Sequence, residues 1–394
     1  MAGLRQLHGK ISSRPTANPI TRAITPMAHD HHTTVPFWTW AAPVAALVLV
    51  ALKYAGLVSD SATPVILLAA VALGACVFAS VHHAEILALR VGEPMGSIIL
   101  AAAVTILEVG LIVSVMLAGS EGAETVARDT VFSALMIVLN CVIGLCLILG
   151  GRRHHEQTFQ LNAASAALAV LGTLGTVVMV LPNFVNTVGP QQFSSVQLLV
   201  VGAVSLILYA MFVFVQTIKH RDYFMDMPED NASVEQASPE LPSSRVTLAS
   251  AAMLPVSLLV VILLAKVLSH PLESLVAAAG LPQAVVGVVI ATLVLLPEGI
   301  ASIRAALLNR LQNSVNLVLG SALASIGMTI PVVAAVAVLT DRRLALGLSP
   351  ASTVLLLLTL FVSTITLGTG RTTVLQGAVH IGIFVVFLLV TAVP

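Results

Sequence analysis

The feature that most constrains the fold is a succession of long apolar runs along a chain of 394 residues. A helix of about 20 apolar residues crosses the roughly 30 Å hydrocarbon core of a bilayer, and helices satisfy their own backbone there. We predict an all-α polytopic membrane protein with about eleven transmembrane helices. Their expected positions are 37–58, 63–82, 95–118, 130–150, 163–182, 194–217, 246–268, 283–306, 314–339, 351–368 and 372–393.

The low content of charged residues excludes an ordinary soluble protein. Asp, Glu, Lys and Arg make up 9% of the chain, against about 25% in soluble domains. The mean hydropathy is +1.02, and the formal net charge is zero, so the charge balance indicates no nucleic-acid partner. We expect the lipid bilayer as a partner and no cofactor. The sequence leaves the oligomeric state open.

The polar residues divide the chain into five segments. We expect a polar N-terminal tail at 1–35, a first transmembrane helix at 36–60, an N-terminal five-helix repeat at 61–218, an acidic cytoplasmic linker at 219–245 and a C-terminal five-helix repeat at 246–394. The acidity of the linker could attract cations, although a soluble connector is the simpler interpretation.

The distribution of Lys and Arg predicts the orientation in the membrane. With a cytoplasmic N-terminus, thirteen of the 18 basic residues fall in cytoplasmic segments, as the positive-inside rule favours. Because each half has an odd number of spans, the two halves would enter the membrane in opposite directions. That is the geometry of an inverted-topology repeat. A Ser-Ala-Leu triplet begins at Ser133 in the first half and at Ser321 in the second half, which is a weak sequence similarity between the proposed repeats.

Two acidic residues, Glu108 and Glu298, each lie alone near the centre of an apolar run, one in each half. An acid at the middle of a bilayer costs at least about 2.5 kcal/mol, so such a residue indicates a functional site. Inverted repeats bring equivalent helices together at the midplane, and we expect the two glutamates to approach each other there.

Two carboxylates in a dry site cannot both remain charged without compensation. Protonation and the binding of a cation each relieve the repulsion, and the two states exclude one another. Competition between protons and a cation is the physical basis of a cation/proton antiporter. Oxygen ligands favour Ca²⁺, Na⁺ or K⁺ over softer metals.

Further oxygen ligands are needed because Ca²⁺ takes about 6–8 of them. Candidates are the hydroxyls of Ser133, Ser321 and Ser325, and carbonyls freed by an unwound segment at Pro297. For any one of these serines, helix packing is the alternative role. Asn140 could face the site, and His380 could relay protons.

From about residue 36 to the end, the chain resembles the ChaA-type calcium (sodium, potassium)/proton antiporters of the calcium/cation antiporter superfamily. The matching stretches are HAEILALRVGEPMGS at 83–97, ILEV at 106–109, PEG at 297–299, NLVLGS at 316–321 and TGRT at 369–372, with Gly377 and His380. The resemblance implies eleven spans in two inverted repeats, alternating access, and paired repeat glutamates at Glu108 and Glu298.

The chain departs from the superfamily pattern just before each glutamate. Many members carry Gly-Asn three to four residues earlier, where this chain has Val104-Thr105 and Val294-Leu295. A cation/proton site is therefore the firmer expectation than a strict Ca²⁺ site.

We predict a secondary active antiporter, not an enzyme, that exports Ca²⁺ from the cytoplasm in exchange for H⁺, with Na⁺ or K⁺ as further candidate substrates. We expect it in a bacterial inner (plasma) membrane. The alternatives are a Na⁺ or K⁺/proton antiporter with little Ca²⁺ transport, a channel, and an intramembrane enzyme that uses the two acids for hydrolysis.

Overall fold

The computed structural model of the chain describes residues 36–57, 63–92, 95–119, 122–185, 189–225 and 241–393. The expected polar tail at 1–35 lies outside these residues, as do positions 226–240 of the expected linker. Residues 35–394 form one compact unit. All statements on the fold refer to the described part of this unit.

The unit is built from helices that follow the apolar runs. The α-helices are α1 (Trp38–Tyr54), α2 (Thr63–Val91), α3 (Met95–Ala118), α4 (Val126–Met136), α5 (Ile143–His154), α6 (Leu161–Gly175), α7 (Ser195–Phe214), α8 (Ser244–Ala278), α9 (Ala284–Leu307), α10 (Leu311–Gly327), α11 (Thr329–Leu339), α12 (Pro350–Leu367) and α13 (Val374–Ala392). Shorter π- or 3₁₀-helical segments are η1 (Ile137–Val142), η2 (Thr176–Val180), η3 (Leu181–Asn183), η4 (Val215–Lys219) and η5 (Arg221–Phe224).

Ten helical segments of the described chain are long and apolar enough to cross a membrane, five before residue 220 and five after residue 243. The odd number in each half gives the halves opposite directions, as the all-α inverted-repeat prediction requires. The remaining apolar helix, α1, has 17 residues and is therefore about 25 Å long, slightly short of the hydrocarbon thickness.

The structure moves several predicted boundaries. Helix α2 continues to Val91, well past the predicted end at 82, and His83 in this extension bonds to Ser250 of α8 and to the Thr39 carbonyl of α1. Helix α8 has 35 residues and runs through Pro255 and Pro271. The predicted span at 314–339 is divided near Met328 into α10 and α11.

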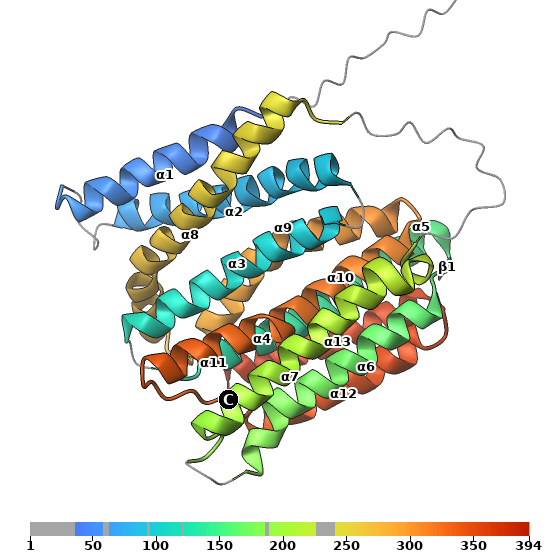
Figure 1. Ribbon diagram of the computed structural model, residues 1–394. Helices are drawn as coiled ribbons and strands as arrows, with labels where there is room; N and C mark the ends of the chain where they lie inside the picture. The colour runs from blue at the N-terminus through green and yellow to red at the C-terminus, as the bar shows by residue number, and fades with distance from the viewer. Residues whose placement is uncertain are drawn as a thin grey trace, which may run out of the picture. The chain divides into compact units, whose positions relative to one another are not determined.

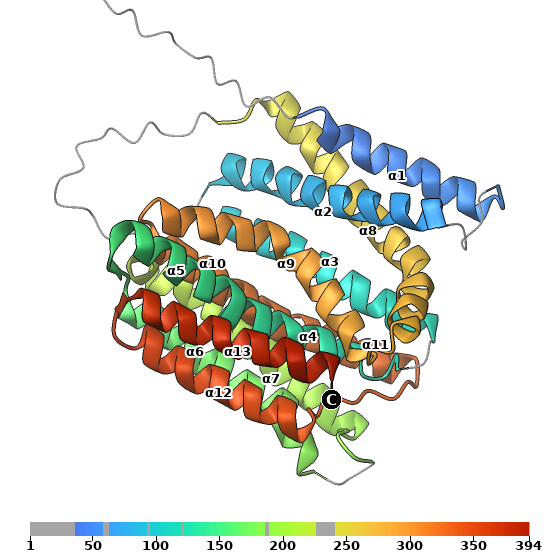
Figure 2. The same cartoon turned by 180° about the vertical axis from the view of Figure 1, so that it is seen from behind.

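The helices pack around two apolar cores. One core joins α1, α2 and α8 with parts of α3 and α9. The other joins α4 to α7 and α10 to α13, with other buried residues of α3 and α9. Figures 1 and 2 show α3 and α9 between these two groups from opposite sides. These two helices therefore lie at the border of the cores.

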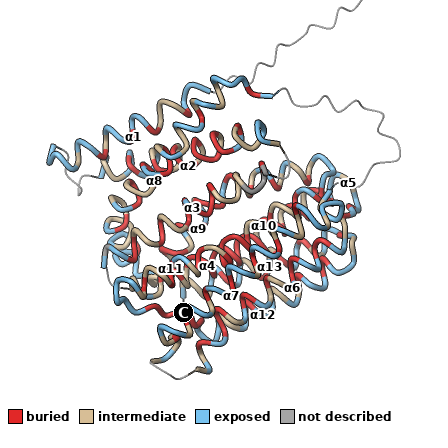
Figure 3. Tube along the Cα trace, viewed as in Figure 1, coloured by how far each residue is buried: buried red, intermediate tan, exposed pale blue. Residues whose placement is uncertain are grey.

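The most enclosed span is the one formed by α4, η1 and α5. In the apolar window of Val126–His154, 83% of the residues are buried inside the protein, against 22% for α13. Figure 3 shows buried residues gathered along α4 and α10. Most side chains on this span therefore face the protein interior.

Loops of the two halves are paired by short backbone contacts. Strand β1 (Gln157–Thr158), between α5 and α6, pairs antiparallel with β2 (Arg371–Thr372), between α12 and α13, with Gln157 opposite Thr372. An isolated bridge joins Gln192 to Ala345, in the loops before α7 and α12. The two halves are thus joined by loop contacts as well as by helix packing.

Candidate functional site

Glu108 lies in the middle of α3, where that helix contacts both cores. Glu108 is only 3% exposed to solvent. The Oε2 atom accepts a hydrogen bond of 2.7 Å from Ser325 Oγ, and the Oε1 atom is buried without a hydrogen-bond partner among the described residues. A buried carboxylate oxygen without a partner is costly, so this atom is available to a proton or a cation.

Glu298 occupies the equivalent place on α9 and is half-buried. Its Oε2 atom accepts a hydrogen bond from Ser321 Oγ. The expected unwound segment at the preceding Pro297 is absent, because α9 is continuous from Ala284 to Leu307. Proline removes one backbone donor, and membrane helices tolerate this loss where neighbouring groups compensate.

Helix α10 supplies the hydroxyls for both glutamates. Ser321 and Ser325 are separated by four residues and face the same side of α10, about 6 Å apart along its axis. One turn of α10 therefore connects Glu298 on α9 with Glu108 on α3, and the two halves of the protein meet there. Two of the three serines predicted from the sequence thus contact the glutamates.

Ser133 and Asn140, on the enclosed fourth span, do not contact the glutamates. Ser133 Oγ donates 2.6 Å to the carbonyl of Asp129 in its own helix, which is the packing role considered from the sequence. The side chain of Asn140 bonds to Thr359 and His380, on the side of α12 and α13. The expectation that Asn140 faces the glutamates is therefore wrong in this structure.

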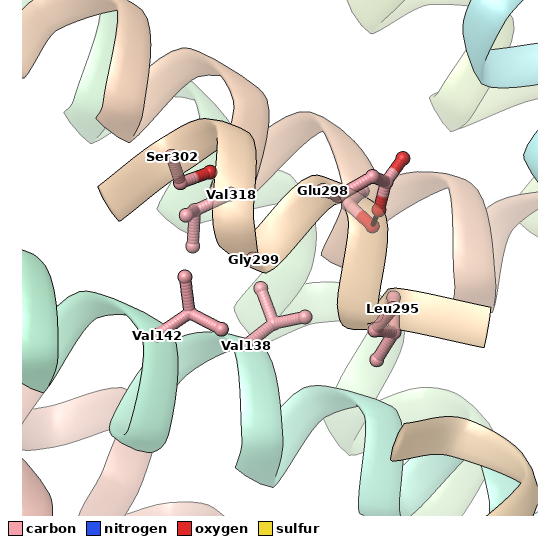
Figure 4. A pocket seen from close by; sticks show the side chains of 8 residues that line it. Val138, Val142, Leu295, Glu298, Gly299, Ser302 and Val318 are labelled. Carbon is pink, nitrogen blue, oxygen red and sulfur yellow. Dashed lines mark hydrogen bonds between the residues drawn. The ribbon is translucent and has the colours of Figure 1, made fainter. Parts of the chain in front are cut away.

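A small cavity adjoins Glu298 between α9, α10 and the η1 turn. Figure 4 shows the side chains around it. The lining residues are Val138, Val142, Leu295, Glu298, Gly299, Ser302, Val318 and Ser321. The wall is mainly apolar, and its polar groups come from α9 and α10.

Ser302 is a polar residue of this cavity that the sequence analysis missed. It is 0% exposed, and its Oγ has no hydrogen-bond partner in the described structure. Several buried helical hydroxyls of the described chain bond to a carbonyl of the preceding turn, as Ser80 and Thr105 do. Other buried hydroxyls without a partner among the described residues include Thr130, Thr329 and Ser363. The spacing of four residues from Glu298, which places both on one face of α9, is the signal that could have identified it.

No described Lys or Arg forms an ion pair with Glu108 or Glu298; the ion pairs of this part of the chain lie elsewhere, as between Arg128 and Asp129. The described residues also contain no group of three or more His, Cys, Asp or Glu that could hold a metal ion. No described basic side chain therefore neutralises negative charge on the two glutamates.

The comparisons of this chain with known proteins agree with one another. The profile of the sodium/calcium exchanger protein family matches residues 61–218 and 249–393. A relative from Sinorhizobium fredii (strain NBRC 101917 / NGR234), the candidate ionic transporter y4hA, is 62% identical over 360 residues, which are 91% of this chain and 97% of the relative. The sodium-potassium/proton antiporter ChaA of Escherichia coli (strain K12) is 35% identical over 347 residues, 88% of this chain and 94% of ChaA.

Solved structures show the same fold at low sequence identity. The structure of native YfkE superposes with a TM-score of 0.68 at 16% identity and covers 90% of this chain and 100% of YfkE. The H⁺/Ca²⁺ exchanger CAX gives a TM-score of 0.66 at 15% identity, covering 90% of this chain and 88% of CAX. At this identity the likeness concerns the arrangement of the helices.

Proposed function

Because the chain belongs to the sodium/calcium exchanger family, which consists of secondary transporters, we propose that it is a cation/proton antiporter that exports Ca²⁺ from the cytoplasm in exchange for H⁺. Na⁺ and K⁺ are further candidate substrates. Glu108 and Glu298 would bind the cation and the protons in turn, and Ser321 and Ser325 would contribute hydroxyl oxygens.

The observation that supports this proposal best is the pair of glutamates on α3 and α9, each bonded to a serine of one turn of α10 and neither paired with a described basic residue. A permanent counter-charge would remove the need for an ion. Its absence from the described part makes the charge state of the pair depend on what binds.

The exchange cycle follows from this dependence. With both glutamates deprotonated, a cation binds between carboxylate and hydroxyl oxygens, and the loaded site can change the side that it faces. Protons then displace the cation, and the neutral pair returns. An empty pair carries uncompensated buried charge and returns poorly. This penalty couples the export of the cation to the entry of protons.

The relatives support both choices of cation. ChaA of Escherichia coli is named as a sodium-potassium/proton antiporter, and a selenium-substituted YfkE structure and CAX are named as Ca²⁺/H⁺ exchangers. Monovalent exchange with little Ca²⁺ transport is therefore the second candidate function, since ChaA is the more similar in sequence.

We also propose the arrangement in the membrane. The segments 61–218 and 246–394 would be inverted five-helix repeats, preceded by a tail at 1–35 and a helix at 36–60, and joined by a cytoplasmic linker at 219–245. The N-terminus would be cytoplasmic and the membrane a bacterial inner membrane. The excess of basic residues in the segments assigned to the cytoplasm supports this arrangement.

The deciding experiment measures cation-induced loss of a pH gradient in energised inverted membrane vesicles. Ca²⁺, Na⁺ and K⁺ are added separately to wild-type protein, Glu108→Gln and Glu298→Gln. Glu124→Gln, which changes an exposed acid in the loop before α4, is the matched control. We expect at least one cation to dissipate the gradient in wild type and in the control, and in neither site variant. Full exchange in both site variants, or no response of wild type to any of the three cations, would overturn the proposal.

A further inference from the structure

A second buried polar cluster lies on the other side of the enclosed fourth span. Its members are Met136, Asn140, Thr359, Thr366 and His380, which come from α4, η1, α12 and α13. Both Asn140 and His380 are 0% exposed. Polar groups inside a membrane protein are costly, and they are retained where they bond to one another.

The bonds of this cluster form one directed chain. The Oδ1 atom of Asn140 can only accept, so His380 Nδ1 must carry the proton in their 3.2 Å contact. The neutral ring then accepts at Nε2 from the hydroxyl of Thr366, 3.1 Å away. Every hydrogen-bonding atom of the imidazole is satisfied without a charge.

The hydrogen bonds beyond Asn140 run in the same donor-to-acceptor direction. Its Nδ2 donates 2.9 Å to Thr359 Oγ1, and the hydroxyl of Thr359 in turn donates to the sulfur of Met136 at 3.4 Å. Chains of hydrogen bonds with one direction strengthen one another. The cluster therefore holds the amide of Asn140 in a single orientation between α12 and α13.

Two glycines bring α13 close enough for this contact. A Cβ atom on Gly377 would lie 2.7 Å from the carbonyl oxygen of Gly144, and a Cβ on Gly144 would lie 3.0 Å from the carbonyl oxygen of Gly377. The backbones of α5 and α13 thus approach closely at the two glycines, beside the side chains of Ile148 and Ile381. His380 follows Gly377 by one turn, and Asn140 precedes Gly144 by one turn.

Asn140 lies in η1, a six-residue π-helical segment inside the fourth span. Single π-helical turns inside α-helices are rare in proteins and frequently lie at functional sites; η2 and η4 are two further π segments of the described chain. Such a turn needs tertiary contacts to prevent its return to regular α-helix. The fixed amide of Asn140 supplies one.

The opposite face of the same π turn forms the wall of the glutamate cavity. Val138 and Val142, two positions before and after Asn140, line the space beside Glu298. Val142 also packs on α9, where its Cγ2 lies 3.4 Å from the position of a Cβ on Gly299. A change of register in η1 would therefore alter the surroundings of Glu298.

We propose that His380 and Asn140 are positioning residues that hold the π turn Ile137–Val142 against Glu298 and so set the affinity of the exchanger for its cation. The inference rests on the proposed function and deepens it. His380 acts as a neutral hydrogen-bond donor through Asn140; it carries no transported proton.

The test compares His380→Asn with His380→Leu in the full-length protein reconstituted in liposomes. An asparagine amide can place its N–H near the position of the histidine Nδ1 and keep the bond to Asn140, although it cannot titrate. We expect His380→Leu to raise the half-saturating cation concentration about 10-fold or more, the range of outer-shell effects on metal sites. We expect His380→Asn to retain most of the affinity and the wild-type pH profile.

Hydrogen–deuterium exchange of residues 137–142 gives a readout that needs no transport. It should be faster in His380→Leu than in wild type and His380→Asn. The double variant Asn140→Leu/His380→Leu, which leaves neither partner unsatisfied, should regain thermal stability and keep the low cation affinity.

Three results would overturn the inference: equal loss of exchange in His380→Asn and His380→Leu, which would indicate a titrating histidine; wild-type affinity in the folded double variant; or unchanged hydrogen exchange in all variants. Absence of exchange in wild-type protein would contradict the proposed function, and hydrogen exchange would still decide whether His380 holds the π turn.

Discussion

At the scale of single residues, the hydroxyl groups around the glutamates differ in what they contact. Ser325 and Ser321 donate to Glu108 and Glu298, whereas Ser302 donates to no described group although it is fully buried. A buried polar atom without a partner lowers stability. Its position beside the cavity fits a site that is complete only when an ion or water is present.

Ser325→Ala should weaken cation binding more than it weakens folding. The substitution leaves both oxygens of Glu108 without a hydroxyl donor, and a hydrogen bond to a charged group contributes about 1.5–3 kcal/mol, or roughly 10-fold or more in affinity. The measurement is the half-saturating cation concentration for exchange. Ser80→Ala, which removes a buried hydroxyl bonded to the Cys76 carbonyl on α2, is the control. Equal values for the two variants would contradict the role given to Ser325.

Ser302→Ala should make the protein more stable and its cation exchange slower. Removal of an unsatisfied buried hydroxyl is expected to raise the free energy of unfolding by about 1–2 kcal/mol, since no hydrogen bond is lost. If Ser302 serves the ion or its water, the same variant should exchange cations more slowly. The measurements are a thermal unfolding curve and the rate of cation-dependent proton movement. A less stable variant with wild-type exchange would contradict both expectations.

At the scale of elements, α3 and α9 are central because they border both apolar cores and carry the glutamates. The surroundings of α3 and α9 depend on how closely the other helices pack. On the far side of the fourth span, the glycine contact between α5 and α13 sets the distance between these two helices. A methyl group there would meet backbone atoms, which cannot move aside independently of their helix.

Gly377→Ala is therefore expected to destabilise the protein. The new Cβ would lie 2.7 Å from the Gly144 carbonyl oxygen and 2.9 Å from the Ile148 nitrogen, and overpacking of this kind costs about 1–3 kcal/mol. Gly172→Ala in α6 is the matched control, because its Cβ would meet nothing within 4 Å. The control should be neutral or slightly stabilising. Thermal unfolding in detergent measures both, and equal effects would contradict this account of the helix contact.

At the scale of the whole described unit, five spans in each half and the pairing of loops between the halves give two opposite ends. Strands β1 and β2 lie at one end, and the bridge of Gln192 with Ala345 lies beyond the opposite ends of their helices. With the proposed orientation, the first of these ends is cytoplasmic.

Cysteine labelling tests this orientation. Glu156→Cys next to β1 and Thr340→Cys after α11 replace exposed residues, and the native cysteines are buried or half-buried. A membrane-impermeant maleimide should label Glu156→Cys in inverted vesicles and Thr340→Cys in right-side-out vesicles. The reverse pattern would place the N-terminus outside and would leave the inverted repeat intact. Labelling of both from one side would contradict the repeat.

The class of fold and the two candidate glutamates could be predicted from the amino-acid sequence alone. Hydropathy is a local property, so ten of the predicted spans correspond to span-length helices, and an acid inside an apolar run is conspicuous whatever surrounds it. The family resemblance, which the comparisons confirm, rests on short motifs that are also local.

Which polar groups contact one another became clear from the packing of the helices. A helix that is apolar all round gives no sign of the face that meets a neighbour, so the sequence could not predict that Ser321 and Ser325 serve different glutamates or that Asn140 turns to His380. The π turn at Ile137–Val142 could not be predicted from the sequence either, because it depends on contacts from α12 and α13 more than 200 residues away. Local composition places the spans, and long-range packing orients their side chains.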